Sequence, residues 1–312
     1  MPLPAAARTA QATAETPDCP HLGVTMMLFS TTAKRPRFRA VRLIALTLTI
    51  ALAGCPGLGQ RDLTEVSPHR SPGDTARATV RRGTVQSETG CRIDTTAYQP
   101  RQPRTPSPVI LAHGFLRDQR RMAGLAQALA DQGIPAVTLN FCNARLWDGR
   151  HVQNGRDMIS VAREFGSGRV VYAGFSAGGL AALVAGRLDP NALGILTLDL
   201  VDDRGIGVGM ARALDKPLIG LGGDPTACNA GNNGRAVFAA SPKARLTAIP
   251  GASHCDFESP TNSLCEAVCR GLNKGSPLRR RAIIAASVTA VSDLIGLSGR
   301  RKARASRGPQ PR

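Results

Sequence analysis

The chain has 312 residues, 42% of them hydrophobic, which is enough for a sizeable buried core. Aromatic residues make up only 4%, which argues against a surface that stacks sugars or bases. The formal net charge is +18, but six basic and two acidic side chains lie in residues 1–54, and nine basic and one acidic in residues 279–312. Because most of the excess is terminal, a nucleic-acid-binding face is not needed to explain it, and no nucleic-acid partner is expected.

The first predicted element is an export signal. Five basic residues between Lys34 and Arg42 precede the apolar run 43–53, which has about the length of a signal-peptide core and is too short to span a bilayer comfortably. The run ends in Leu-Ala-Gly-Cys at residues 52–55. This resembles a bacterial lipobox, in which the cysteine is lipidated and becomes the mature N-terminus. The alternative is a short anchor or buried helix that happens to end in cysteine.

We therefore expect residues 1–54 to be a leader with a lipoprotein signal peptide. The lipidated Cys55 would attach the protein to a membrane, in the periplasm or at the outer membrane of a bacterial cell envelope. Residues 55–85 are rich in Pro, Gly, Ser, Thr and Arg and predict a tether.

From residue 86 onward, apolar runs alternate with helical patterns. Strands are predicted at 108–112, 134–141, 169–173, 193–200, 217–221 and 244–249. Helices are predicted at 121–132, 157–165 and 180–188, with a closing helix in 282–297. This alternation predicts an α/β domain over 86–297, with a mostly parallel, doubly wound sheet covered on both faces. Residues 298–312 predict a basic disordered tail.

Six cysteines remain once the leader is removed and Cys55 is lipidated. Export would place them in an oxidising space where disulfides persist. Their spacing selects no pairing. Metal ligation is disfavoured, because no CxxC pair is present and no histidine pair lies near the last two cysteines. The six are Cys91, Cys142, Cys228, Cys255, Cys265 and Cys269.

The sequence Gly-Phe-Ser-Ala-Gly at 174–178 matches GxSxG and lies between a predicted strand and a predicted helix. A nucleophile at Ser176 would occupy a sharp turn, so its neighbours must be small for strand and helix to approach. The turn would raise the hydroxyl above the sheet edge at the start of the helix. A chance strand-turn-helix with small residues is the alternative.

With these motifs the chain resembles the α/β-hydrolase family, in particular its dienelactone-hydrolase-like, chlorophyllase-like and polyester-hydrolase-like serine hydrolases. The resemblance covers roughly residues 86–275 and rests on spaced motifs. It implies the α/β-hydrolase fold. It also implies an oxyanion hole made by the backbone N–H groups of Phe115, in the His113-Gly114-Phe115 turn, and Ala177. His113 is expected to brace that turn.

The resemblance implies a base after the nucleophile, and His254 is the single histidine that follows Ser176. Asp224, after the strand 217–221, is the expected triad acid. Its rivals are Asp199 and Asp202 after the preceding strand. Asp256 is expected to be a loop or capping residue.

These residues predict a serine hydrolase that cleaves carboxylic esters through an acyl-enzyme, with Ser176, Asp224 and His254 as the catalytic triad. The substrate would be a small-molecule, lipid or polyester-like ester. Trp147, near Arg145 and Asp148, is expected in the pocket, the core or a lid. No metal or organic cofactor is implied. A thioesterase or peptidase on the same triad, or a non-catalytic surface binding lipoprotein, remain alternatives.

Overall fold

A computed structural model describes residues 78–142, 149–166, 168–269 and 275–297. Several expectations lie outside these residues: the leader, lipidation at Cys55, most of the tether, and the basic tail. Trp147 and its neighbours Arg145 and Asp148 lie outside them too. Within the described ranges, no helix is both long and apolar enough to cross a bilayer.

Eight strands form one sheet in the order β1-β2-β4-β3-β5-β6-β7-β8. The pairings of β1 with β2 and of β2 with β4 are antiparallel, and the others are parallel. A parallel sheet directs the carboxyl ends of its strands to one edge, which is where open α/β folds bind ligands. The strands are β1 (Thr79–Gln86), β2 (Arg92–Gln99), β3 (Val109–Ala112), β4 (Ala136–Leu139), β5 (Val170–Phe175), β6 (Ala192–Leu198), β7 (Leu218–Gly222) and β8 (Ala244–Ala248).

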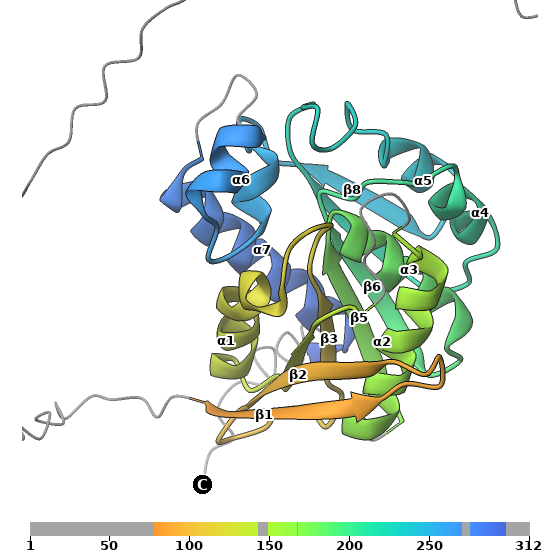
Figure 1. Ribbon diagram of the computed structural model, residues 1–312, viewed down its shortest axis with the longest axis vertical. Helices are drawn as coiled ribbons and strands as arrows, with labels where there is room; N and C mark the ends of the chain where they lie inside the picture. The colour runs from red at the N-terminus through yellow and green to blue at the C-terminus, as the bar shows by residue number, and fades with distance from the viewer. Residues whose placement is uncertain (1–77, 143–148, 167, 270–274, 298–312) are drawn as a thin grey trace, which may run out of the picture. The chain divides into compact units, whose positions relative to one another are not determined.

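Helices cover both faces of the sheet, as the alternating pattern predicted (Figure 1). Helices α1 and α7 pack on one face, and α2, α3 and α4 lie on the other. The helices are η1 (Gln119–Met122), α1 (Ala123–Asp131), α2 (His151–Phe165), α3 (Ala177–Leu188), α4 (Ile206–Arg212), α5 (Arg235–Ala239), η2 (His254–Phe257), α6 (Ser263–Val268) and α7 (Pro277–Leu294).

The central strand β3 shows why its sequence is apolar without alternation. All four of its residues are buried. Ile110 and Ala112 join the core beneath α2 and α3, whereas Val109 and Leu111 join the core beneath α1 and α7. A strand covered on both faces needs apolar side chains at every position, so a continuous apolar run identified it correctly.

The hairpin of β1 and β2 was not predicted, and β1 lies within the expected tether. Seven of the eight residues of β1 are exposed, so the edge strand carries no apolar pattern. It is ordered by its ladder with β2 and by the buried carboxylate of Asp157 in α2, which accepts from the hydroxyls of Ser87 and Thr89 at 2.5 Å each. The described sheet therefore includes Thr79–Gln86, a segment that was expected to belong to the tether.

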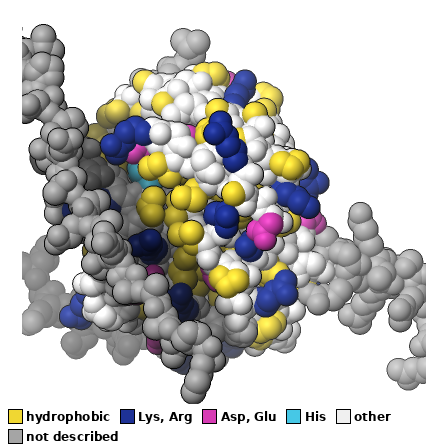
Figure 2. Space-filling view, turned by 90° about the vertical axis from the view of Figure 1, so that its right-hand side faces the viewer, with side chains coloured by type: hydrophobic (Ala, Val, Ile, Leu, Met, Phe, Trp, Pro, Cys, Tyr) yellow, Lys and Arg dark blue, Asp and Glu magenta, His cyan; other side chains and the backbone are white. Residues whose placement is uncertain are grey.

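Basic side chains are dispersed over the face on the right of Figure 1. Figure 2 shows Lys and Arg there among apolar and uncharged side chains, with few Asp or Glu. No single patch of positive charge gathers on the part of this face that the described residues form.

Candidate active site

Ser176 occupies the single-residue junction between β5 and α3. Its backbone has φ 56° and ψ −123°, a conformation that residues with side chains rarely adopt. A Cβ on Gly174 would lie 2.2 Å from the carbonyl oxygen of Gly178, and one on Gly178 would lie 2.3 Å from that of His113. The N–H of Ser176 donates to the carbonyl of Leu198 at 2.8 Å. The hydroxyl is therefore held at the carboxyl edge of the sheet by a turn whose flanks leave no room for side chains.

His254 opens η2 on the segment that follows β8. Its Nε2 lies 3.0 Å from Oγ of Ser176, which is hydrogen-bonding distance. The imidazole also packs against the ring of Phe175, with centroids 4.6 Å apart. The two residues that sequence analysis paired as nucleophile and base therefore meet, although 78 positions separate them.

Asp256 fixes the start of the helix that carries His254. Its carboxylate accepts from the N–H of Ser253 at 3.0 Å and from the Ser253 hydroxyl at 3.2 Å. The same buried carboxylate pairs with Arg279 and Arg280 of α7, each at 3.3 Å. Asp256 thus caps η2, as expected, and in addition ties the histidine segment to a long helix packed on the sheet.

The carboxylate beside His254 belongs to Asp199 and not to Asp224. Nδ1 of His254 lies 2.6 Å from Oδ2 of Asp199. The Asp224 carboxylate instead accepts from the N–H of Gly251, at the turn before the histidine, at 3.1 Å. Asp202, the other rival, accepts from the N–H of Gly207 at 2.6 Å. The expectation for Asp224 is therefore corrected in favour of Asp199.

The strand order explains this correction. β6 pairs directly with β5, whereas β7 lies one strand further out. Asp199 follows the last residue of β6 with a φ of 45°, which is left-handed backbone. Its position at the end of the strand next to β5, which leads into Ser176, brings the Asp199 carboxylate within reach of the imidazole. Ser176, His254 and Asp199 are 6%, 5% and 2% exposed, so their hydrogen bonds are largely shielded from water.

Two further groups hold the Asp199 carboxylate. Oδ1 accepts from the N–H of Gly223 at 2.9 Å, and Oδ2 accepts from Nδ2 of Asn229 at 3.1 Å. With Nδ1 of His254, the carboxylate therefore has three partners. Asn229 was not predicted as a site residue, because an asparagine in a loop rich in Gly and Asn carries no distinguishing pattern.

The turn that follows β3 lies directly against the serine. A Cβ on Gly114 would lie 3.2 Å from Cβ of Ser176. The N–H of Arg117 donates to the carbonyl of Gly114 at 3.2 Å, and Leu116 has a φ of 55°, so the backbone doubles back beside Phe115. Ala177, the other expected oxyanion donor, is the first residue of α3, and the amide of a helix's first residue has no acceptor within its helix.

His113 braces this turn, as the sequence predicted. Its Nδ1 faces the carbonyl of Gly114 at 2.7 Å, and its Nε2 faces the N–H of Phe141 at 3.2 Å. A carbonyl requires a donor and an amide N–H requires an acceptor, so the ring is neutral with its proton on Nδ1. Burial lowers the pKa of His113 from its ordinary value, which favours the same neutral form.

A buried ion pair joins the Gly114 turn to the segment after His254. The guanidinium of Arg117 contacts both carboxylate oxygens of Glu258, with Nε 2.9 Å from Oε2. It also donates to Oδ1 of Asn262 at 2.9 Å. The Thr261 hydroxyl donates to Glu258 at 2.8 Å. The Glu258 side chain is 0% exposed, so this carboxylate depends on protein partners in place of water.

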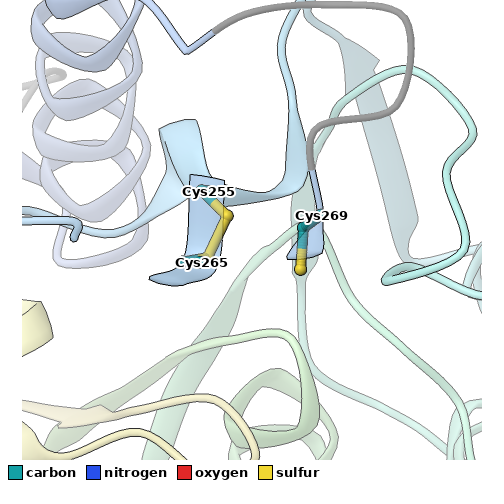
Figure 3. Close-up of side chains that lie close together, drawn as sticks. All are labelled: Cys255, Cys265 and Cys269. Carbon is teal, nitrogen blue, oxygen red and sulfur yellow. A yellow bond between two sulfur atoms is a disulfide. The ribbon is translucent and has the colours of Figure 1, made fainter. Parts of the chain in front are cut away.

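All six cysteines of the expected mature domain form disulfides: Cys91–Cys142, Cys228–Cys269 and Cys255–Cys265. Two of these bonds lie beside the candidate site, because Cys228 precedes Asn229 and Cys255 follows His254 in the sequence. Figure 3 shows Cys255 bonded to Cys265, with Cys269 nearby. The sulfurs of these three residues lie within 4.8 Å of one another, a spacing that could hold a metal ion. All three are oxidised, however, so none offers the thiolate that zinc sites use.

No protein-family model matches the chain, and no protein of curated function matches it. Solved structures with a similar fold do exist. A dienelactone hydrolase from Anabaena variabilis is 15% identical, with a TM-score of 0.53 over 70% of this chain and 97% of that one. An α/β serine hydrolase homologue from Coxiella burnetii is 18% identical, with a TM-score of 0.48 over 56% and 88%. An esterase domain from Rhodothermus marinus is 16% identical, with a TM-score of 0.45 over 57% and 90%. The likeness to the first of these, with the strand order above, establishes the α/β-hydrolase fold.

Proposed function

We propose that the protein is a serine hydrolase that cleaves carboxylic esters, with Ser176 as nucleophile, His254 as base and Asp199 as acid. One observation carries the proposal: a continuous hydrogen-bonded chain runs from Oγ of Ser176 through both imidazole nitrogens to the Asp199 carboxylate. A serine hydroxyl is a weak nucleophile unless a base takes its proton, and that base must be oriented by a third group.

The reaction proceeds in two acyl transfers. Oγ of Ser176 attacks the ester carbonyl while Nε2 of His254 takes the hydroxyl proton, and His254 then gives that proton to the leaving alkoxide. The N–H groups of Phe115 and Ala177 are the proposed donors to the oxyanion. Water, deprotonated by His254, attacks the acyl-enzyme. Ser176 leaves with the proton, and the carboxylic acid is released.

The choice of ester over other acyl compounds is supported by the fold neighbour described as a dienelactone hydrolase, since a lactone is a cyclic ester. The proposed substrate is a small-molecule, lipid or polyester-like ester. A thioesterase or peptidase would use the same three residues, so substrate profiling separates these activities.

The test is turnover of a matched panel of nitrophenyl esters, acyl thioesters and peptide amides by the wild type and Ser176→Ala. We expect the highest kcat/KM on an ester and a fall of at least about 10³-fold in Ser176→Ala. A higher kcat/KM on a thioester or an amide would identify the protein as a thioesterase or a peptidase in place of an esterase. Equal turnover by both proteins would contradict the proposed nucleophile, and no turnover of any compound would favour a binding module.

We further propose that the protein is exported and anchored through a lipidated Cys55. The three disulfides of the folded domain support this, because such bonds persist in oxidising compartments and are rare in the cytosol. When the chain is expressed in a bacterium, mass spectrometry of the membrane fraction should find an acylated mature N-terminus at Cys55, and Cys55→Ser should leave the membrane. An N-terminus before residue 55, or unchanged fractionation of the variant, would contradict the anchor.

A further inference from the structure

The loop between β7 and α5 contains an asparagine that contacts the candidate acid directly. Asn229 is 0% exposed, and its side chain makes four hydrogen bonds. Oδ1 accepts from the N–H groups of Thr226 at 2.7 Å and Asn232 at 3.1 Å. Nδ2 donates to Oδ2 of Asp199 at 3.1 Å and to the carbonyl of Asp224 at 2.9 Å. The amide therefore uses both of its N–H groups as well as its oxygen.

These contacts determine which way the amide points. Oxygen and nitrogen of an asparagine can be told apart only from their partners. The two groups near Oδ1 are backbone N–H donors, which require an acceptor. The two groups near Nδ2 are a carboxylate and a carbonyl, which require a donor. The reversed orientation would set donors against donors and acceptors against acceptors, so Asn229 must direct an N–H at Asp199.

The loop itself is anchored next to this asparagine. The preceding residue, Cys228, is bonded to Cys269 at the end of α6. The N–H of Asp224 donates to the carbonyl of Ala252, two residues before His254, at 2.9 Å. The segment that carries Asn229 is thus joined to the segment that carries the imidazole, and it approaches Asp199 with little freedom to withdraw.

We propose that Asn229 is a positioning residue of this site. It holds Oδ2 of Asp199, the oxygen that faces Nδ1 of His254, while Gly223 holds Oδ1. A carboxylate fixed at both oxygens keeps one lone pair directed at the imidazole, which in turn keeps Nε2 directed at Ser176. Outer partners that orient a functional side chain typically contribute in this way, through the residue they hold. The inference rests on the proposed function, because it assigns Asn229 to the same triad.

A double-mutant cycle of Asn229→Ala and Asp199→Ala tests the proposal, with kcat and KM measured on the best nitrophenyl ester. Asn229→Ala alone should lower kcat by about 10- to 100-fold, the range for a lost hydrogen bond to a charged group, with little change in KM. In the Asp199→Ala background, the same substitution should change kcat by less than about twofold, because the group it positions is gone.

Asn233→Ala is the matched control. Asn233 is an asparagine of the same loop, and it bonds the backbone N–H and carbonyl of Asp202 at 3.0 and 2.8 Å. Its loss removes two hydrogen bonds between the same pair of loops but none to the Asp199 carboxylate. We expect kcat within about twofold of the wild type.

A second variant guards against failure of Asn229→Ala to fold. Asn229→Asp keeps an acceptor for the N–H groups of Thr226 and Asn232, although it loses the donor to the carbonyl of Asp224. It replaces the donor beside Asp199 with an acceptor, so kcat should fall at least as far. Wild-type kcat in this variant, or an equal loss from Asn229→Ala with and without Asp199, would overturn the proposal. Failure of the proposed function would look different, because Ser176→Ala would then match the wild type.

Discussion

Asp199→Asn is expected to lower kcat for ester hydrolysis by about 10⁴-fold, the loss that follows when a triad acid becomes an amide. The surroundings of Asp199 explain why the amide would be misdirected. Its oxygen must stay on the N–H of Gly223, which requires an acceptor. The new NH₂ group would then face Nδ1 of His254 and the NH₂ group of Asn229. Nδ1 would have to accept, so the ring proton would move to Nε2, and His254 could not take a proton from Ser176.

Asp224→Asn is the control for this substitution. The carboxylate of Asp224 accepts from the N–H of Gly251, and an amide oxygen can take over that bond. We expect kcat within about tenfold of the wild type, because the altered group does not face the imidazole. Steady-state kinetics of both variants decide between the two aspartates. A large loss in Asp224→Asn with little loss in Asp199→Asn would refute the assignment of Asp199.

Arg117→Met is expected to destabilise the fold by about 3–5 kcal/mol, the range for removing one partner of a buried ion pair. Methionine preserves much of the apolar stem but leaves the Glu258 carboxylate, which is 0% exposed, without its countercharge. The hydroxyl of Thr261 would remain as a donor, but a neutral group does not replace a bidentate guanidinium. Urea unfolding of the disulfide-bonded protein measures the loss. The midpoint should fall, while the dependence of the unfolding free energy on urea concentration should stay similar.

Arg120→Met provides a matched comparison, three residues away in the same connection. The Arg120 side chain is 78% exposed, and its bond to Asp118 at 2.8 Å lies at the surface. Exposed ion pairs contribute little, because water solvates both charges well. The midpoint of unfolding should stay that of the wild type. If both variants unfold at the same urea concentration, the Arg117–Glu258 pair does not hold these two segments together.

The inner parallel strands were predictable because they are buried on both faces. The runs at β3, β5, β6 and β7 are short and apolar without alternation. The predicted first and last residue of each lies within two residues of the strand's observed end. The edge hairpin was not predictable, since β1 exposes nearly every side chain and contains Arg and Gly, so it resembles a linker. Its order comes from the ladder with the neighbouring strand β2 and from Asp157, 70 residues after Ser87, and neither contact leaves an apolar pattern in β1 itself.

In the candidate site, too, some residues carry a local sequence signal and others depend on contacts between distant segments. Ser176 was predicted because its turn demands glycines at fixed positions, and His254 because a single histidine follows Ser176; the structure places their side chains 3.0 Å apart. The acid could not be fixed, since an aspartate follows each of two neighbouring strands and only the strand order decides between them. Asn229 and the disulfide pairing depend wholly on how distant loops meet, and spacing along the chain does not encode this.

The proposed function requires Ser176 to be a nucleophile activated by His254. Intact-mass spectrometry after reaction with a fluorophosphonate tests it most directly, because only an activated serine displaces the fluoride at a useful rate. We expect one stoichiometric adduct on the wild type, mapped by peptide digestion to Ser176. We expect no adduct on Ser176→Ala and greatly slowed labelling of His254→Ala. A wild-type protein that stays unlabelled, or an adduct that persists in Ser176→Ala, would contradict this role of Ser176.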